Sequence, residues 1–534
     1  MMVKTISALA VYDAIKSGQE LAFLDVREQG VYAQGHPLFA IFIPLSRFEL
    51  TIDRLVPRKN VPVILFDQGG GEKLAQRAAL FLQQAGFSDV SVMEEGVSGW
   101  RKAGLELFSG VNVPSKAFGE LVEHECQTPH ITAEQLQGRL DKGETVVILD
   151  SRPFDEFERM CIPGGIDMPG AELVHRVFGL LGSDEETPVV VNCAGRTRSI
   201  IGAQSLINAG IKNPVMALKD GIMGWYLQGY KLEDKAQRVA PAPSLPALEK
   251  SVAAARDLGA RAGIQMIDRL QLETFQANAD KQSLFLLDVR TKAEFLEGYV
   301  AGSQHAPGGQ LVQACDEYVG VRGAVLVLID DREVRAWMTA SWLAQLGWPQ
   351  VYVFKDLDDV RLLTGEDDQI PVPETDYISP MELDAVIASG EPAAVIDLAP
   401  SSAYREGHIP GAFWMIRARA DFDLNMLPAV GFVVITADDE RLAHLAAPEI
   451  KAIRPELIVR VLQDGNTGWR KAGYKITADN SKYLSAIEDV WRKPYDDASK
   501  VRERMQEYLD WEVALVPQIE RDGSTAFNIL KPGI

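Results

Sequence analysis

Cysteine is scarce in this chain. Only four occur among 534 residues, at positions 126, 161, 193 and 315, and none belongs to a C-x-x-C pair. Scattered cysteines provide neither the ligand spacing of a structural zinc site nor a disulfide framework. The sequence therefore predicts no metal site and no cofactor. It favours a reducing cytoplasm, in which one well-placed cysteine can act as a nucleophile.

Long apolar segments and an excess of positive charge are also missing. No stretch approaches the ~20 apolar residues that a membrane-spanning helix requires. The N-terminal apolar run is interrupted at Tyr12 and Asp13 and lacks a clear cleavage site, so it indicates the start of a domain and not a signal peptide. The net charge is -21. Such a charge repels nucleic acid and anionic membranes, and neither is expected as a partner.

One unit is repeated four times along the chain. Each copy has a short apolar run ending in aspartate, a loop ten residues later, a second apolar run and an amphipathic helical segment. The four aspartates are Asp25, Asp150, Asp288 and Asp397. Short apolar runs that alternate with helical periodicity are typical of parallel strands buried on both faces. The sequence therefore predicts an α/β fold with four small parallel sheets flanked by helices.

The repeats also set the expected domain boundaries. Four domains are expected at residues 1–112, 113–239, 240–373 and 374–477, followed by a helical extension at 478–534. A Pro-rich and then Ala-rich linker at 240–263 opens the third range. In the extension, Met505, Leu509, Val513 and Val516 are spaced for one helix face. This face predicts packing on a domain or on a second subunit, which leaves a homodimer open.

Only the second copy carries a cysteine where its second apolar strand ends. The stretch "VVVNCAGRTRS" runs from that strand through Cys193 into a helix that begins near Ser199. Ligands of parallel α/β sheets bind at the carboxyl ends of the strands. Inward-facing backbone amides and the helix dipole lower the pKa of a cysteine and stabilise an attached anion. We therefore expect a nucleophilic thiolate at Cys193, beside Arg196 and Arg198, which can hold a doubly charged oxyanion.

These features resemble the rhodanese (thiosulfate sulfurtransferase) family. The resemblance is carried by the Asp-x-Arg strand ends, the "GHIPGA" loop of the fourth copy and the loop "CAGRTRS", and it covers most of the chain. It implies four tandem domains, each a five-stranded parallel sheet flanked by helices, with only the second one active. It also implies that a cysteine takes the outer sulfur of thiosulfate as a persulfide and passes it to cyanide, glutathione or a thioredoxin-like thiol.

The resemblance assigns a role to each residue of this loop. Cys193 is the expected nucleophile and persulfide carrier. The expected substrate-binding residues are Ala194, Gly195, Arg196, Thr197, Arg198 and Ser199, with backbone amides as an anion cradle and the two arginines on the sulfonate of the donor. Many family members have arginine where this chain has Ala194. Asp150 and Arg152 are expected to form a supporting ion pair beneath the loop.

The other three copies lack the thiol. Asp67 and Asp330 occupy its position in the first and third copies, and Thr436, Ala437 or Asp438 does so in the fourth. A carboxylate can accept hydrogen bonds from the same inward amides, so the loop can keep its shape. It cannot carry sulfur, and its charge repels an anionic donor. These copies are therefore predicted to be structural or regulatory.

Two other functions remain open. Three copies without the loop cysteine and an acidic surface are also compatible with a non-catalytic sulfur-binding scaffold or regulator. A phosphatase or arsenate reductase of the same fold is less favoured by the loop length. Cysteine phosphatases hold phosphate with Cys-x5-Arg, whereas Cys193 and Arg198 form Cys-x4-Arg. The smaller ring suits a terminal sulfur better than a phosphoryl group.

Overall fold

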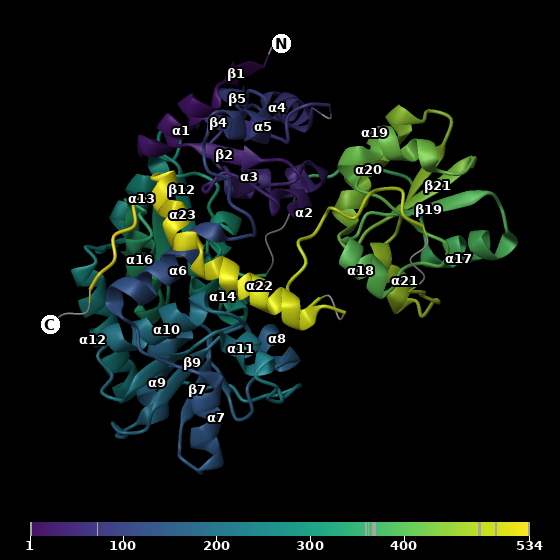
Figure 1. The fold of residues 1–534 in the computed structure, drawn as a ribbon. Coiled ribbons are helices and arrows are strands. Elements are labelled where there is room, and N and C mark those ends of the chain that lie inside the picture. Colours follow the sequence, from purple (N-terminus) through teal and green to yellow (C-terminus); the bar gives the residue numbers. More distant parts are fainter. Residues whose placement is uncertain are drawn as a thin grey trace.

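The computed structural model describes residues 3–71, 73–357, 360, 362–365, 370–478, 482–496 and 499–531. These residues form four five-stranded sheets in which every pair of neighbouring strands is parallel. Helices cover the sheets (Figure 1). The predicted α/β class is therefore confirmed. We call the parts built around the four sheets units 1 to 4, in chain order.

Unit 1 has the strand order β1-β5-β4-β2-β3. Its central strands are buried on both faces, as the continuous apolar runs predict; all four residues of β4 are buried, for example. Its elements are β1 (Lys4–Ile6), α1 (Ala8–Lys16), β2 (Ala22–Asp25), α2 (Gln29–Tyr32), β3 (Ile41–Phe42), α3 (Ile52–Leu55), β4 (Val63–Phe66), α4 (Leu74–Gln84), β5 (Val90–Met93) and α5 (Gly96–Lys102).

Unit 2 repeats this topology with the strand order β6-β10-β9-β7-β8. Helix α6 (Val113–Cys126) precedes it. Its elements are β6 (His130–Ile131), α7 (Ala133–Asp141), β7 (Val147–Asp150), α8 (Phe154–Arg159), β8 (Ile166–Asp167), α9 (Glu172–Leu181), β9 (Val189–Asn192), α10 (Thr197–Asn208), β10 (Val215–Leu218) and α11 (Gly221–Leu227).

Unit 3 follows the long helix α12 (Leu245–Arg261), which lies in the expected linker, and its strand order is β11-β16-β15-β12-β14. Its elements are β11 (Gln265–Ile267), α13 (Arg269–Ala277), β12 (Leu284–Asp288), α14 (Lys292–Glu297), β14 (Ser303–His305), α15 (Gly308–Gln313), β15 (Val325–Ile329), α16 (Val334–Gln345) and β16 (Val351–Phe354). The short strands β13 (Tyr299–Val300) and β17 (Leu362–Leu363) add an antiparallel pair.

Unit 4 has the same strand order, β18-β22-β21-β19-β20. Its elements are β18 (Tyr377–Ile378), α17 (Pro380–Ser389), β19 (Ala393–Asp397), α18 (Ser401–Glu406), β20 (Phe413–Trp414), α19 (Ala420–Asp423), β21 (Phe432–Thr436), α20 (Glu440–Ile453), β22 (Ile458–Leu462) and α21 (Gly465–Lys471).

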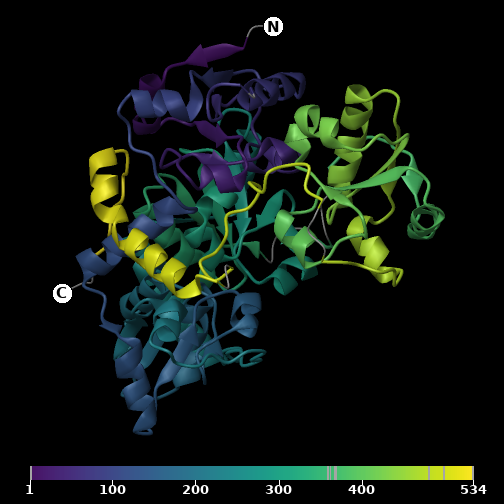
Figure 2. The same cartoon turned by 45° about the vertical axis from the view of Figure 1, so that its right-hand side comes forward.

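Units 1 to 3 share one apolar core. A single cluster of buried side chains runs from Leu24 in unit 1 through Val191 in unit 2 to Leu326 in unit 3. Helices α9, α12 and α16 pack on one another between units 2 and 3. Unit 4 has separate apolar clusters and lies to one side in both ribbon views (Figures 1 and 2). Arg417 joins it to unit 1 through a bidentate contact with Glu49 at 2.7 and 2.8 Å.

The C-terminal tail returns from unit 4 to the other units. Its first part runs past α2 of unit 1, where Trp491 N donates to Gln29 Oε1 at 3.0 Å. Helices α22 (Val501–Val513) and α23 (Leu515–Asp522) then pack across α6 (Figure 2). The tail was expected to pack on a domain or on a second subunit. In the structure it packs on domains of its own chain.

The apolar face expected for the tail is only partly correct. Met505 and Leu509 are buried, but Val513 is 53% exposed. Helix α22 ends at Val513, and α23 starts a new helix after Ala514, so Val513 and Val516 do not continue the face of Met505 and Leu509. The buried residue at the next helical position is Glu512.

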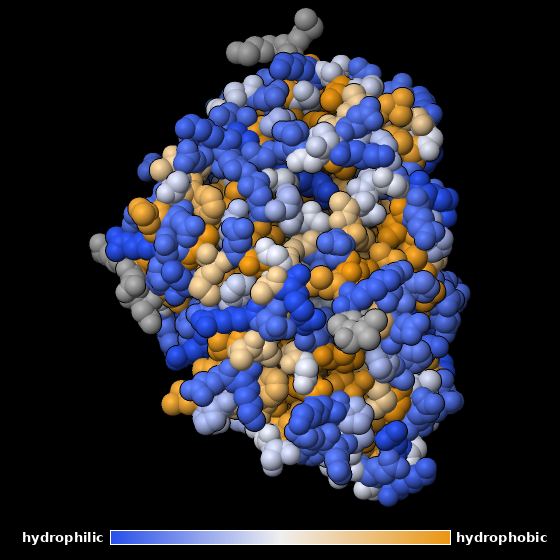
Figure 3. All heavy atoms as spheres, turned by 90° about the vertical axis from the view of Figure 1, so that its left-hand side faces the viewer, coloured by the Kyte–Doolittle hydropathy of each residue, from blue (hydrophilic) through white to orange (hydrophobic). Residues whose placement is uncertain are grey.

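The face shown in Figure 3 is covered mainly by hydrophilic residues, with hydrophobic residues in separate patches. This pattern is ordinary for a protein that buries most of its large apolar side chains. Among the residues that the structure describes, no helix combines the length and the apolar character needed to cross a bilayer.

Candidate active site

Cys193 lies directly after β9, a strand that is buried throughout and is flanked by β7 and β10. It stands at the carboxyl end of that strand, and α10 begins four residues later at Thr197. The thiol donates to Ser199 Oγ at 3.7 Å, and Ser199 Oγ in turn donates to Arg196 O at 2.7 Å. The structure thus brings Cys193 and Ser199 together at the edge where parallel sheets bind ligands.

The first turn of α11 contacts the backbone of the Cys193 loop. Ile222 N donates to Cys193 O at 2.9 Å, and Met223 N donates to Ala194 O at 3.0 Å. Gly221 has a φ of +52°, and a Cβ there would lie 2.4 Å from Cys193 O. Only glycine fits such an approach of two backbones. This explains why a glycine recurs four residues before Trp100, Trp225 and Trp469.

The same turn identifies the equivalent residue in unit 4. Val97 N donates to Asp67 O in unit 1 at 2.9 Å, and Asn466 N donates to Ala437 O in unit 4 at 2.9 Å. Of the three residues that the sequence left open, Ala437 therefore occupies the position of Cys193.

Carboxylates replace the thiol in units 1 and 3, and backbone amides of the following loop and helix bind them. Asp67 accepts from the amides of Gly69 at 2.8 Å and Ala75 at 3.0 Å. Asp330 accepts from Arg335 N at 2.8 Å and from Ala336 N at 3.3 Å. The expectation that an aspartate satisfies the inward amides is confirmed for both loops.

A buried ion pair supports the floor of the site. Arg152 Nε and Nη2 donate to the two oxygens of Asp150 at 2.8 and 2.7 Å, and both residues are buried. Asn192 Nδ2, from the residue before Cys193, donates to Asp150 Oδ2 at 3.0 Å. The pair therefore ties the end of β7 to the end of β9.

The two arginines of the loop have different surroundings. Arg196 binds three carboxylates: Glu120 at 2.7 and 2.8 Å, Glu123, and Asp220 at 3.0 Å. With its guanidinium held by three acids, Arg196 ties the loop to α6 and is not placed as an anion ligand, in contrast to the expected role.

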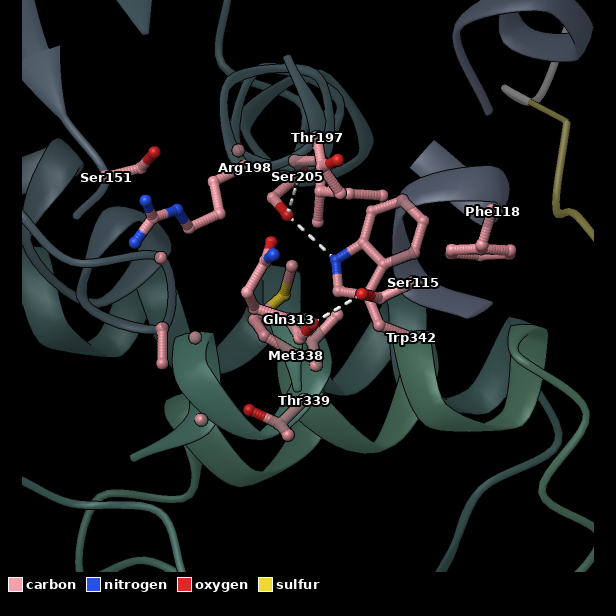
Figure 4. A pocket seen from close by; sticks show the side chains of 17 residues that line it. Ser115, Phe118, Ser151, Thr197, Arg198, Ser205, Gln313, Met338, Thr339 and Trp342 are labelled. Atoms are coloured by element: carbon pink, nitrogen blue, oxygen red, sulfur yellow. Dashed lines mark hydrogen bonds between the residues drawn. The ribbon is translucent and has the colours of Figure 1, made fainter. Parts of the chain in front are cut away.

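Arg198 faces the reactive side of the loop. Its Nη1 and Nη2 donate to the two oxygens of Glu156 at 3.1 and 2.9 Å. Burial raises the pKa of the Cys193 thiol, and the positive charge of Arg198 opposes that rise. In Figure 4 its side chain extends away from Trp342, on the side where Ser151 lies. Of the two arginines, Arg198 is therefore the one that acts electrostatically on the thiol.

Sequence reasoning missed three residues, and two of them come from the tail. Glu512 accepts from Thr197 Oγ1 at 3.3 Å and from Tyr508 OH at 3.0 Å. A Cβ on Gly195 would lie 3.0 Å from Glu512 Oε2 and 3.2 Å from Tyr508 Cε1. The third is Lys116 of α6, which is buried close to Glu512. The sequence does contain a signal for Glu512. Its helical spacing from Met505 and Leu509 puts it on the same, buried face of α22, where an acidic residue is unusual.

Burial governs the protonation of this site. Cys193 is only 2% exposed, and burial raises the pKa of its thiol above the ordinary value. The positive charge of Arg198 and hydrogen bonding with Ser199 oppose that rise, while the charge of Glu512 adds to it. The expected lowering of the Cys193 pKa is therefore wrong for this arrangement, because α22 covers the loop and removes it from water.

Burial also shifts the pKa values of the ionisable groups near Cys193 toward their neutral forms. Burial raises the pKa of Glu512 to about 7, although the charge of Lys116 opposes the rise. Burial lowers the pKa of Lys116 to about 8. Glu512 Oε2 is buried without a hydrogen-bond partner among the described residues. Near neutral pH, Glu512 is consequently poised between its charged and neutral forms.

On its other side, α10 borders a small pocket between units 2 and 3 (Figure 4). It is lined by Arg198 and Thr197 from unit 2 and by Gln313, Met338 and Trp342 from unit 3, and its volume is about 40 Å³. That volume admits one or two water molecules. Within the described parts of the chain, no cluster of three side chains suited to a metal ion is found.

The chain is similar to one protein family and to a solved structure that matches almost its whole length. The family model "Rhodanese-like domain" matches residues 7–103, 132–228 and 271–356, a little over half of the chain. The crystal structure of a thiosulfate sulfurtransferase from Pseudomonas aeruginosa is 45% identical, with a TM-score of 0.94, and the match covers 99% of this chain and 100% of that one. Unit 4 has the same strand order but lies outside the ranges matched by the family model.

Curated relatives match shorter parts. SseB of Mycobacterium tuberculosis, named a putative thiosulfate sulfurtransferase, is 24% identical over 208 residues, which cover 32% of this chain and 71% of SseB. YrkF of Bacillus subtilis, named a putative sulfur carrier protein, is 29% identical over 103 residues, which cover 19% of this chain and 54% of YrkF. The chain thus spans about half the length of YrkF, and 45% of a helix-turn-helix-type transcriptional regulator of M. tuberculosis.

Proposed function

This chain belongs to the rhodanese family, and from that premise we propose that it is a thiosulfate sulfurtransferase that works through a persulfide on Cys193. One observation carries the proposal. At the four equivalent strand ends stand Cys193, Asp67, Asp330 and Ala437, and among these only Cys193 has a sulfur nucleophile. It lies in the loop whose counterparts in units 1 and 3 bind an anionic side chain.

The proposed reaction has two steps. The Cys193 thiolate attacks the outer sulfur of thiosulfate, the sulfur–sulfur bond of the donor breaks, and sulfite leaves with the electron pair. An acceptor such as cyanide or a thiolate then attacks the outer sulfur of the persulfide, and Cys193 leaves as a thiolate. The positive charge of Arg198 and hydrogen bonding with Ser199 favour the anionic forms of Cys193 and oppose the effect of its burial.

We assign the sulfonate end of the donor to Arg198 and not to Arg196. Arg198 acts on Cys193 and, among the described residues, forms an ion pair with one acid, Glu156. Arg196 is held by three carboxylates that an anionic donor would have to displace. Units 1, 3 and 4 are then structural, and Asp67 and Asp330 keep the shape of their loops.

Mass spectrometry tests this function. After incubation with thiosulfate, the Cys193 peptide should gain one sulfur atom, and addition of cyanide should remove it as thiocyanate. Cys193→Ser should give neither the adduct nor turnover. A wild-type protein that never gains sulfur would support the scaffold alternative. We also propose a reducing compartment, the cytoplasm, because all four cysteines are free thiols.

A further inference from the structure

Helix α22 lies over the Cys193 loop. A Cβ on Gly195 would lie 3.0 Å from Glu512 Oε2 and 3.2 Å from Tyr508 Cε1. Under this cover, the whole of Cys193 is only 2% exposed. Attack on thiosulfate requires the outer sulfur of the donor to touch the Cys193 sulfur in a defined direction. So small an exposed surface does not admit that contact.

The other walls of the site belong to the fold of unit 2, whereas α22 is attached through side chains. Strand β9 lies within the sheet, and backbone hydrogen bonds join α11 to the loop. Among the described residues, no hydrogen bond between two backbone groups joins α22 to unit 2. Arg502 donates to the carbonyls of Tyr226 at 3.3 Å and of Leu227. Glu512 accepts from Thr197 Oγ1 at 3.3 Å. Helix α22 can therefore leave without breaking the backbone structure of unit 2.

The following helix, α23, is held more firmly than α22. Its residues Leu515 and Ile519 are buried in an apolar cluster of unit 1 that also contains several of the large side chains of that unit. The buried apolar cluster between α22 and unit 2 is small and consists of Met223, Met505 and Leu509. The two helices thus differ in their attachment, and α22 can move while α23 stays docked on unit 1.

A proline weakens the joint between the two helices. Ala514 follows the last residue of α22 and precedes the first residue of α23. In a continuous helix, the amide of residue 517 would donate to the carbonyl of Val513. Residue 517 is a proline, which has no amide hydrogen, so this hydrogen bond cannot form. Helices bend where such a bond is lost. The joint at Ala514 is therefore the place at which α22 can turn.

A few side-chain contacts hold α22 in its place, and one feature opposes them. The ammonium of Lys116 on α6 lies 5.7 Å from the ring centre of Tyr508 and 5.2 Å from that of Trp511. Trp511 also lies against Gly110, where a Cβ would be 2.5 Å from its Cζ2. In the same position, however, Glu512 Oε2 is buried without a hydrogen-bond partner among the described residues. Contact with water would remove that cost, so it favours opening.

We propose that α22 is a lid over Cys193, that it opens about the joint at Ala514, and that thiosulfate reaches the thiol only in the open state. The last point rests on the proposed function of Cys193. When opening and closing are fast, the rate of any reaction at the thiol equals the rate in the open state multiplied by the fraction of open molecules. Substitutions that loosen α22 therefore accelerate every reaction at Cys193 by a common factor.

Alkylation of Cys193 by iodoacetamide measures opening without sulfur transfer. Leu509→Ala removes a buried apolar contact and should raise the alkylation rate of the Cys193 peptide about tenfold or more. Arg502→Gln removes hydrogen bonds to two carbonyls, disturbs no buried side chain, and should raise the rate severalfold. Arg504→Gln is the matched control and should leave the rate unchanged, because the ion pair described for Arg504 is with Glu507 of the same helix. Equal rates in the wild type and all three variants would overturn the proposal.

Hydrogen exchange separates opening of the lid from unfolding of the protein. In the wild type, amides of α22 should exchange faster than those of α23 and α6. Arg502→Gln should accelerate exchange in α22 and leave α23 and α6 unchanged. Equal protection of α22 and α23 in both proteins would show that the tail does not open at Ala514, and would refute the lid.

Loading with thiosulfate connects the lid with the reaction. At low thiosulfate concentration, persulfide formation in Leu509→Ala and Arg502→Gln should accelerate by the same factors as alkylation. Faster alkylation with unchanged loading would show that the donor reaches Cys193 by another route, and would overturn the proposal. Absence of a persulfide on wild-type Cys193 would refute the proposed function, while alkylation and hydrogen exchange would still judge the lid.

Discussion

The Glu512 carboxylate of α22 accepts a hydrogen bond from the Thr197 hydroxyl at 3.3 Å, across 315 positions of sequence. Thr197 is the first residue of α10, in the loop that holds Cys193. The C-terminal tail is therefore part of the same site as the thiol, although it lies outside the repeat that contains Cys193. Tyr508 and Glu512 of α22 also lie against Gly195 of the loop that holds the buried thiol.

Glu512→Gln should shift the titration of Cys193 to lower pH. The negative charge of Glu512 raises the pKa of the thiol, and an amide of the same shape removes that charge. The rate of alkylation by iodoacetamide as a function of pH measures this pKa. A midpoint unchanged from that of the wild-type protein would show that Glu512 does not act on the thiol.

Arg198→Gln and Arg196→Gln should have different effects. Loss of Arg198 should raise the Cys193 pKa and slow persulfide formation by about tenfold, because a charged partner of the reacting anions is removed. Loss of Arg196 should lower the free energy of unfolding by about 3–5 kcal/mol, because Glu120 is left buried without its ion-pair partner.

Arg196→Gln protein that remains folded should still load Cys193 at nearly the wild-type rate. Stopped-flow loading assays and denaturant unfolding separate the two effects. If Arg196→Gln slowed loading as much as Arg198→Gln while leaving stability intact, the assignment of the two arginines would be reversed.

Docking of the tail should weaken as pH rises. Burial raises the pKa of Glu512 from an ordinary 4.5 to about 7, so docking favours the protonated form. Its contribution is complete below pH 4.5 and is lost as pH rises through about 7. Hydrogen-exchange protection factors of α22, which correct for intrinsic exchange rates, should fall between pH 5.5 and about 8.5.

Glu512→Gln is the control for this effect, since an amide does not titrate. Lys116, Glu120, Arg196 and Tyr508 also face Glu512 and are unchanged in that variant. Protection of α22 should then vary much less with pH. An equal fall in both proteins would assign the pH dependence to another group.

Asp67→Ala should destabilise unit 1 without affecting chemistry at Cys193. The amides of Gly69 and Ala75 would lose their acceptor, at a cost of about 1–3 kcal/mol. Asp67→Asn keeps one carbonyl acceptor and should cost less. Thermal unfolding measures the loss, and persulfide formation should stay at the wild-type rate. Loss of loading in a folded Asp67→Ala protein would give unit 1 a direct role.

Local patterns predicted the strands and the Cys193 loop because each is formed by a short stretch of consecutive residues. The strand "VVVN" is buried on both faces, and Cys193 follows it at the carboxyl edge. The different roles of Arg196 and Arg198 were not predictable by spacing. Arg196 is the non-helical residue before α10 and Arg198 lies in its first turn, so their side chains meet different neighbours.

The role of Glu512 depends on packing between distant segments, which no local pattern encodes. The helical spacing of Met505 and Leu509 correctly predicted a buried face, but it could not tell which loop that face covers. It also failed at Val513, where α22 ends and the register changes. The low pKa expected for Cys193 failed for the same reason, because a helix from the other end of the chain shields it from water.

The most direct test measures whether Cys193 carries sulfur. Wild-type protein incubated with thiosulfate, digested and analysed by mass spectrometry should show one added sulfur on the Cys193 peptide and none on peptides with Cys126, Cys161 or Cys315. Subsequent cyanide should remove it. Sulfur on another cysteine, or none on Cys193 under conditions in which the protein produces thiocyanate, would contradict the assignment of Cys193 as the sulfur carrier.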